Sequence, residues 1–169
     1  MRKLIGFIFL MLWLTLLASG CAPTVQIIAT PNPTLKPEEQ YYAYKDASYN
    51  KVSQCRNALV PFYKTINQLG EGNIEGDQAF FDNIHEYLDQ IELICTILHQ
   101  ENPPAVWANT NDYLKQASGE YQSFVDDFRR GIKNDDPSLI EPANTHYKNA
   151  NSFIDLASKE LDSVQNPYE

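Results

Sequence analysis

Residues 77–98, DQAFFDNIHEYLDQIELICTIL, show the pattern that decides the fold. Apolar side chains recur in this stretch at steps of three and four residues, at Phe80, Ile84, Tyr87, Leu88, Ile91, Ile94, Cys95 and Leu98. Such spacing puts them on one side of an α-helix and leaves charged residues on the other. The stretch therefore predicts an amphipathic helix that has to bury its apolar side against other helices.

Three further stretches share this period, at about residues 37–69, 103–131 and 137–164. Short segments rich in glycine or proline separate them, and we find no convincing alternating pattern of a strand. The predicted fold is all-α, an up-down-up-down four-helix bundle. Five shorter helices are the alternative if Pro61 or Pro142 splits a helix, because a proline inside a helix removes a backbone hydrogen bond.

Cys55 and Cys95 fall on the predicted inner sides of the first two helices. Cys55 lies fifteen residues before Gly70, and Cys95 lies eighteen residues after Asp77. In an antiparallel helix pair these offsets bring the two residues to the same height within about 4–5 Å, at a rise of about 1.5 Å per residue. We predict a structural disulfide between them, and two buried free thiols are the alternative.

The N-terminus has a different pattern. Arg2 and Lys3 precede an apolar stretch over residues 4–17, and small residues lead to Cys21 in the run Leu17-Ala18-Ser19-Gly20-Cys21. A basic tip, a short apolar stretch and a small-residue cleavage site are typical of a secretory signal peptide. The apolar stretch is shorter than the roughly 18 residues that read as a membrane span.

Small residues directly before Cys21 resemble the lipobox of bacterial lipoproteins, and this resemblance covers residues 1–21 only. It implies that residues 1–20 are a cleaved signal peptide and that Cys21 becomes a lipidated N-terminus. The protein would then be anchored by lipid to the cell membrane or the outer membrane, outside the cytoplasm. An ordinary cleaved signal with an incidental cysteine, or an uncleaved N-terminal helix, would be the alternatives.

Residues 21–37 hold the lipidated cysteine of this interpretation and a tether rich in proline and threonine, and residues 38–169 form the predicted bundle domain. Such a tether is semi-rigid and spans up to about 50 Å at about 3.1 Å per residue. The chain has 13 basic and 22 acidic residues, so removal of Arg2 and Lys3 leaves 11 against 22, a formal charge of −11. This acidity argues against nucleic-acid binding and against a domain lying flat on an anionic membrane.

A cluster of tyrosines near residue 41 is the most unusual local composition. Tyr42 and Tyr49 fall off the apolar stripe of the first helix, so we predict a possible binding surface formed by Tyr42, Tyr49 and Trp107. Tyrosine and tryptophan are common at binding surfaces because they are large, rigid and amphipathic.

No motif predicts a cofactor, a metal site or a catalytic residue. The histidines His85, His99 and His146 lack the paired Glu-x-x-His pattern of di-iron bundles, and no Cys-x-x-Cys-His motif for haem is present. The expected function is binding, including a possible envelope protein partner, or a structural role in the cell envelope. A bundle that senses or carries a small molecule or cofactor is the alternative, and an enzyme is a distant third.

Overall fold

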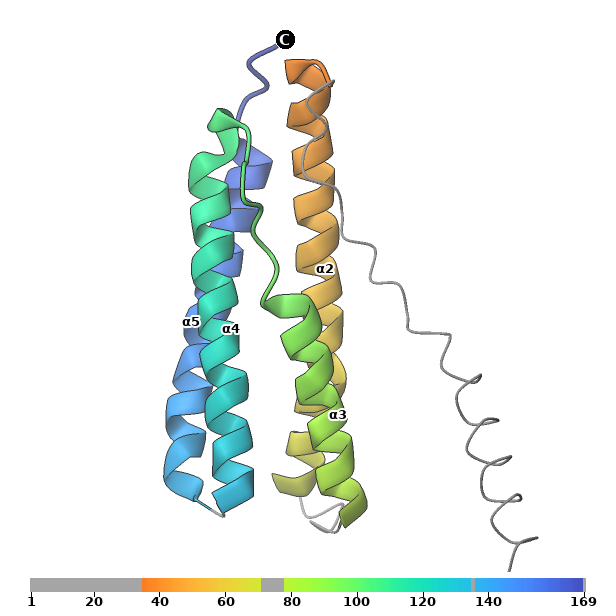
Figure 1. Cartoon of the computed structure of the whole chain (residues 1–169), viewed down its shortest axis with the longest axis vertical. Helices are drawn as coiled ribbons and strands as arrows, with labels where there is room; N and C mark the ends of the chain where they lie inside the picture. The colour runs from red at the N-terminus through yellow and green to blue at the C-terminus, as the bar shows by residue number, and fades with distance from the viewer. Residues whose placement is uncertain (1–34, 71–77, 135, 169) are drawn as a thin grey trace, which may run out of the picture.

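A computed structural model describes residues 35–70, 78–134 and 136–168. Within these residues the chain forms four α-helices and no strand. The helices are α2 (Pro37–Gly70), α3 (Gln78–Cys95), α4 (Ala108–Asn134) and α5 (Ile140–Ser163), with short 3-10 turns η2 (Ala105–Trp107) and η3 (Pro137–Leu139). Successive helices alternate in direction (Figure 1). The predicted all-α, up-down-up-down bundle is confirmed.

Neither proline splits a helix. The helix α2 continues through Pro61, and Pro142 lies in the first turn of α5, so the alternative of five shorter helices is wrong. A proline in the first turn costs little, because the backbone N–H groups there have no partner within the helix. Inside α2 the missing hydrogen bond is offset by the apolar stripe on both sides of Pro61, which includes the buried Leu59 and Phe62.

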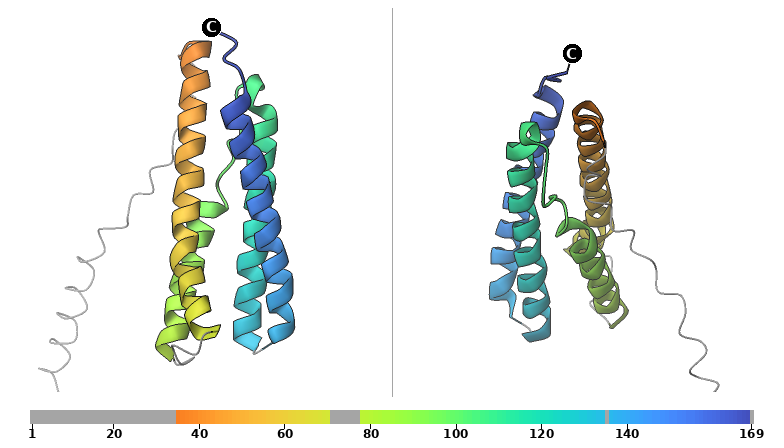
Figure 2. Two further views of the ribbon diagram at one scale, coloured as in Figure 1. Left: turned by 180° about the vertical axis from the view of Figure 1, so that it is seen from behind. Right: turned by 45° about the horizontal axis from the view of Figure 1, so that its top comes forward.

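The helix α3 ends at Cys95, three residues before its predicted end at Leu98. Residues 96–104, which we call the strap, then run toward the opposite end of the bundle before η2 and α4 begin (Figures 1 and 2). Pro104 has the extended angles φ −54° and ψ 142°, and a proline also biases Pro103 before it toward extended backbone. Leu98 is fully buried although it lies outside the helix. Its place in the apolar pattern of the sequence therefore indicates a buried residue and not a helical one.

The helix α4 also differs from expectation at its end. It continues to Asn134, three residues past Gly131, the last residue of the predicted range 103–131. Gly131 is buried, and a Cβ atom at this position would come within 3.0 Å of the Ile140 side chain. The glycine therefore serves close packing between the end of α4 and the start of α5, not helix termination.

Two clusters of buried side chains hold the helices together. The main cluster runs along all four helices and contains the large side chains Phe62, Ile84, Leu88, Leu98, Leu114, Phe124 and Ile154. A smaller cluster of Tyr41, Tyr44, Trp107 and Leu161 lies where α2 begins and α5 ends. Each fully buried side chain of this size contributes about 1.5–3 kcal/mol of hydrophobic free energy.

The predicted signal peptide (1–20), Cys21 and all but the last residues of the tether (21–37) lie outside the described residues. In the part of the chain that is described, no helix has the length and apolar character needed to cross a membrane.

Candidate functional site

The predicted disulfide is present between Cys55 of α2 and Cys95, the last residue of α3. Their Cα atoms are 5.0 Å apart, and both side chains are buried. The two cysteines therefore lie at the same height along the antiparallel helices, as their offsets from the connecting loop predict. The bridge fixes the end of α3 to the middle of α2, at the point where the strap begins.

Trp107 is fully buried, and the prediction that it belongs to an exposed surface is wrong. Its ring lies 4.8 Å from the ring of Tyr41 and 5.7 Å from that of Tyr44. Its Nε1–H donates a hydrogen bond of 3.2 Å to the backbone carbonyl of Tyr41, and the Tyr41 hydroxyl donates one of 3.1 Å to the carbonyl of Val164. The turn η2 directs Trp107 inward, where it joins the start of α2 to the end of α5.

Tyr42 and Tyr49 lie seven residues apart on α2, which is about two turns, so they share one side of the helix. Tyr42 is 42% exposed, and its hydroxyl accepts a hydrogen bond of 2.8 Å from Asn166 Nδ2. Tyr49 is partly buried and donates to the carboxylate of Asp162. Burial, followed by that carboxylate, raises the pKa of Tyr49 to about 12, so its phenol keeps its proton at neutral pH.

Tyr168 belongs to the same region, although no pattern in the sequence indicates this. It is exposed, and its ring stands edge-on to that of Tyr41 with 6.3 Å between centroids. Residues after α5 show no helical period, so only the return of the chain to the start of α2 reveals the proximity. We call Tyr42, Tyr49 and Tyr168 the tyrosine surface. It lies at the end of the bundle where α2 begins and the C-terminal residues return (Figures 1 and 2).

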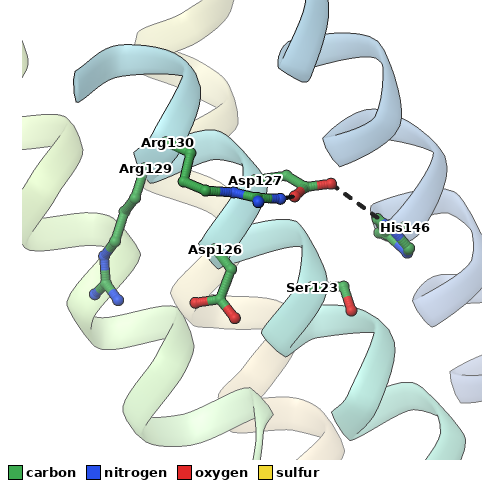
Figure 3. A pocket seen from close by; sticks show the side chains of 6 residues that line it. All are labelled: Ser123, Asp126, Asp127, Arg129, Arg130 and His146. Atoms are coloured by element: carbon green, nitrogen blue, oxygen red, sulfur yellow. Dashed lines mark hydrogen bonds and ion pairs between the residues drawn. The ribbon is translucent and has the colours of Figure 1, made fainter. Parts of the chain in front are cut away.

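A second candidate is an open depression of about 640 Å³, which is lined by Ser123, Asp126, Asp127, Arg129, Arg130 and His146 (Figure 3). Nδ1 of His146 is 2.8 Å from Oε2 of Glu120, and its Nε2 is 3.7 Å from Oδ2 of Asp127. Arg130 donates to the other carboxylate oxygen of Asp127. These charges contact one another, and they join α4 to α5.

The side chain of Arg129, at the edge of this depression, extends toward α3 (Figure 3). Its guanidinium group contacts the carboxylates of both Asp89 and Glu92, and Gln122 Nε2 donates to Glu92 at 3.3 Å. The hydrogen bond from Arg129 holds the pKa of Glu92 below its usual value. Asp89 and Glu92 belong to the charged side of α3, and through Arg129 they join α3 to α4.

The histidines do not form a metal site in the described residues. His85 is exposed on α3, His146 contacts Glu120 and Asp127, and His99 lies in the strap. Over the described parts of the chain, no group of three or more histidine, cysteine, aspartate or glutamate side chains is arranged to hold a metal ion.

Side chains from two helices hold the strap. Nζ of Lys51 in α2 donates to the carbonyls of Ile97 and His99, at 3.0 and 3.2 Å. Asn111 of α4 accepts from the backbone N–H of Gln100 at 2.7 Å and donates to its carbonyl at 2.8 Å. Ser118 Oγ accepts from the N–H of Leu98 at 3.2 Å.

None of these roles of Lys51, Asn111 and Ser118 is indicated by the sequence. A strap position carries no periodic signal, and Asn111 and Ser118 are buried polar residues beside an apolar stripe. Asn111 also accepts a hydrogen bond of 3.2 Å from the hydroxyl of Tyr44, so its side chain connects the strap, α4 and α2.

Comparison of the chain with protein-family models, with curated proteins and with solved structures found no match in any of the three.

Proposed function

We propose that this protein is held by lipid on Cys21 outside the cytosol, and that its bundle has a binding or structural role in the cell envelope. The observation that supports this most directly is the Cys55–Cys95 disulfide. Disulfides persist in oxidising compartments and are rare where thiols are kept reduced. The bridge uses two of the three cysteines of the chain and leaves Cys21, in the lipobox-like run.

The layout of the chain supports the same proposal. A bilayer holds a protein stably when two or more acyl chains insert, because each buried CH₂ group contributes about 0.8 kcal/mol. The lipobox resemblance implies an anchor of this kind on Cys21. The tether of residues 22–37 then leads to the start of α2. The chain without residues 1–20 has a formal charge of −11, so anionic headgroups repel it, and a partner beyond the membrane surface suits it better than the lipid itself.

The tyrosine surface is the part of the bundle that we assign to partner binding. Tyr42 and Tyr168 expose aromatic rings at one end, and protein interfaces are enriched in such side chains. Contacts within the fold hold both rings in place, since Tyr42 contacts Asn166 and Tyr168 contacts Tyr41. Rings that are fixed before binding lose little conformational entropy when a partner arrives.

The experiment that tests the anchor compares the unaltered chain with Cys21→Ser in the bacterial host. The unaltered protein should incorporate labelled fatty acid and enter the detergent phase on phase separation, whereas C21S should do neither. The Cys55→Ala/Cys95→Ala variant is the matched control, because it changes two cysteines and keeps Cys21. Equal partitioning of C21S and the unaltered chain, or their recovery from the cytosol, would refute the proposal.

A further inference from the structure

The strap is held to the rest of the described fold by side chains instead of by the backbone hydrogen bonds of a helix. Its contacts come from Lys51, Asn111 and Ser118, on two different helices. Segments with few backbone hydrogen bonds of their own open at a lower free energy than the helices around them. A change of charge at one of these contacts would therefore act on the strap before it acts on the bundle.

His99 lies in the middle of the strap, and one of its ring nitrogens lacks a hydrogen-bond partner within the described part of the chain. Nδ1 of His99 is buried, and no described residue donates to it or accepts from it. A neutral ring satisfies this position best with its proton on Nε2 and a bare lone pair on Nδ1. The imidazolium form would place an N–H at Nδ1 with no acceptor, which carries the cost of an unpaired buried donor.

The charged groups around His99 act in the same direction. Lys115 of α4 and Lys51 of α2 both disfavour a positive ring, and the weaker effect of Glu101 in the strap favours it. Burial is the largest effect, and together with the two lysines it lowers the pKa of His99 below 6.5. Lys51 is also bonded to the carbonyl of His99 itself, so a movement of this residue away from the bundle breaks that hydrogen bond.

We propose that residues 96–104 form an acid-sensitive latch, in which protonation of His99 releases the strap from Lys51 and Asn111 while α4 and α5 stay folded. The direction of this pH effect follows from the linkage between proton binding and opening of the strap. The open strap binds the proton more tightly than the closed strap, so the closed form loses stability as the pH falls below 6.5, and the loss is complete below the lowered pKa of the closed form. Opening uncovers the apolar side chain of Leu98, which is fully buried when the strap is closed.

Hydrogen exchange of the full-length chain in detergent tests the latch, at about pH 7.5 and about pH 5.5, with rates corrected for intrinsic exchange, because histidine changes charge between these values. Residues 96–104 should exchange several-fold faster in acid, with α4 and α5 unchanged. His99→Gln should remove the difference, whereas His85→Gln, at an exposed position, should keep it. Lys51→Met should open the strap at both pH values, because it removes both of the lysine hydrogen bonds.

Equal corrected exchange of the strap at the two pH values would overturn the proposal. So would an undiminished pH effect in H99Q, or faster exchange of all helices together. An NMR titration of the His99 ring in the unaltered chain gives a second measurement that needs no variant. The midpoint should lie below 6.5, and a midpoint at or above this value would overturn the latch.

Discussion

Trp107 Nε1 donates a hydrogen bond of 3.2 Å to the carbonyl oxygen of Tyr41, a residue 66 positions earlier in the chain. This contact closes one end of the bundle, because the Tyr41 hydroxyl in turn reaches the carbonyl of Val164 at the end of α5. The indole is fully buried among aromatic rings, so it contributes both apolar area and a directed hydrogen bond.

Trp107→Phe should therefore lower the free energy of unfolding by about 1–3 kcal/mol, from lost volume and the lost hydrogen bond. Urea unfolding followed by circular dichroism measures this change. Val60→Ala is the control, since Val60 is 63% exposed and its loss should change stability by less than about 0.5 kcal/mol. Equal stability of W107F and the unaltered protein would show that the end cluster does not hold the bundle.

Removal of the disulfide tests the link between α2 and α3. Cys55 and Cys95 are 40 residues apart, and a closed loop of this length stabilises a fold by about 3–4 kcal/mol, mainly by restricting the unfolded chain. Cys55→Ala/Cys95→Ala should lose about this amount in urea unfolding, and a reducing agent should have no further effect on the variant. Mass spectrometry of freshly prepared, non-reduced protein provides the direct check, and recovery of both free thiols would contradict the bridge.

The contact between Arg129 and Glu92 should make stability depend on pH in acid. The pKa of Glu92 is lowered in the folded state, so its contribution is present above its ordinary pKa of 4.5 and is lost as the pH falls through the lower, folded value. Both groups are partly exposed, so we expect a contribution of about 0.5–1 kcal/mol at most.

Glu92→Gln should flatten the decline of stability below pH 4.5 by this amount. Glu86→Gln, an exposed change on the same helix, should leave the decline as it is in the unaltered protein. Thermal unfolding at a series of pH values gives both curves. If E92Q and E86Q have the same slope, the ion pair with Arg129 has no role in acid stability.

Asn111 should be the polar residue whose loss disturbs the strap most. Its amide accepts a hydrogen bond from the N–H of Gln100 and donates one to the carbonyl of Gln100. It also accepts a hydrogen bond from the Tyr44 hydroxyl. Asn111→Ala leaves these groups without their partner, at about 1–3 kcal/mol for a buried unsatisfied group. Limited proteolysis should then cut within residues 96–104 at a concentration of protease that leaves the unaltered protein intact.

The neighbouring exposed substitution Asp112→Ala is the control for this experiment. Asp112 lies on the same turn of α4 but is exposed, so the rate of cleavage should not change. Equal protease resistance of N111A and D112A would mean that the strap is held without Asn111.

The tyrosine surface makes a prediction about binding. Substitution of Tyr42 and Tyr49 with serine should weaken recovery of a cross-linked envelope partner, because their rings form one side of α2 at the exposed end. Thermal stability should fall by only about 1–2 kcal/mol, since neither ring is fully buried. A paired change at distant exposed positions, Leu93→Ser with Val60→Ser, is the control, and unchanged recovery with the tyrosine variant would remove this surface from the binding proposal.

The sequence predicted the helices and the disulfide because both depend on local spacing. An apolar side chain at every third or fourth position defines one face of a helix, whatever the helix packs against. The positions of Cys55 and Cys95 relative to the connecting loop then set their heights in an antiparallel pair. The same reasoning misplaced the end of α3, because Leu98 continues the apolar period even though it lies in the strap.

Contacts between distant polar groups were decided by the tertiary structure alone. Arg129 reaches Asp89 and Glu92, and Lys51 reaches the strap, only because the helices adopt one rotation and one height relative to each other. Trp107 is likewise turned inward by the short η2 turn, whose direction no periodic pattern encodes. Spacing along the chain specifies which side of a helix is apolar. Which partner a polar side chain contacts depends on the packing of all four helices at once. For this reason the strap and its contacts with Lys51, Asn111 and Ser118 are defined only by the tertiary structure.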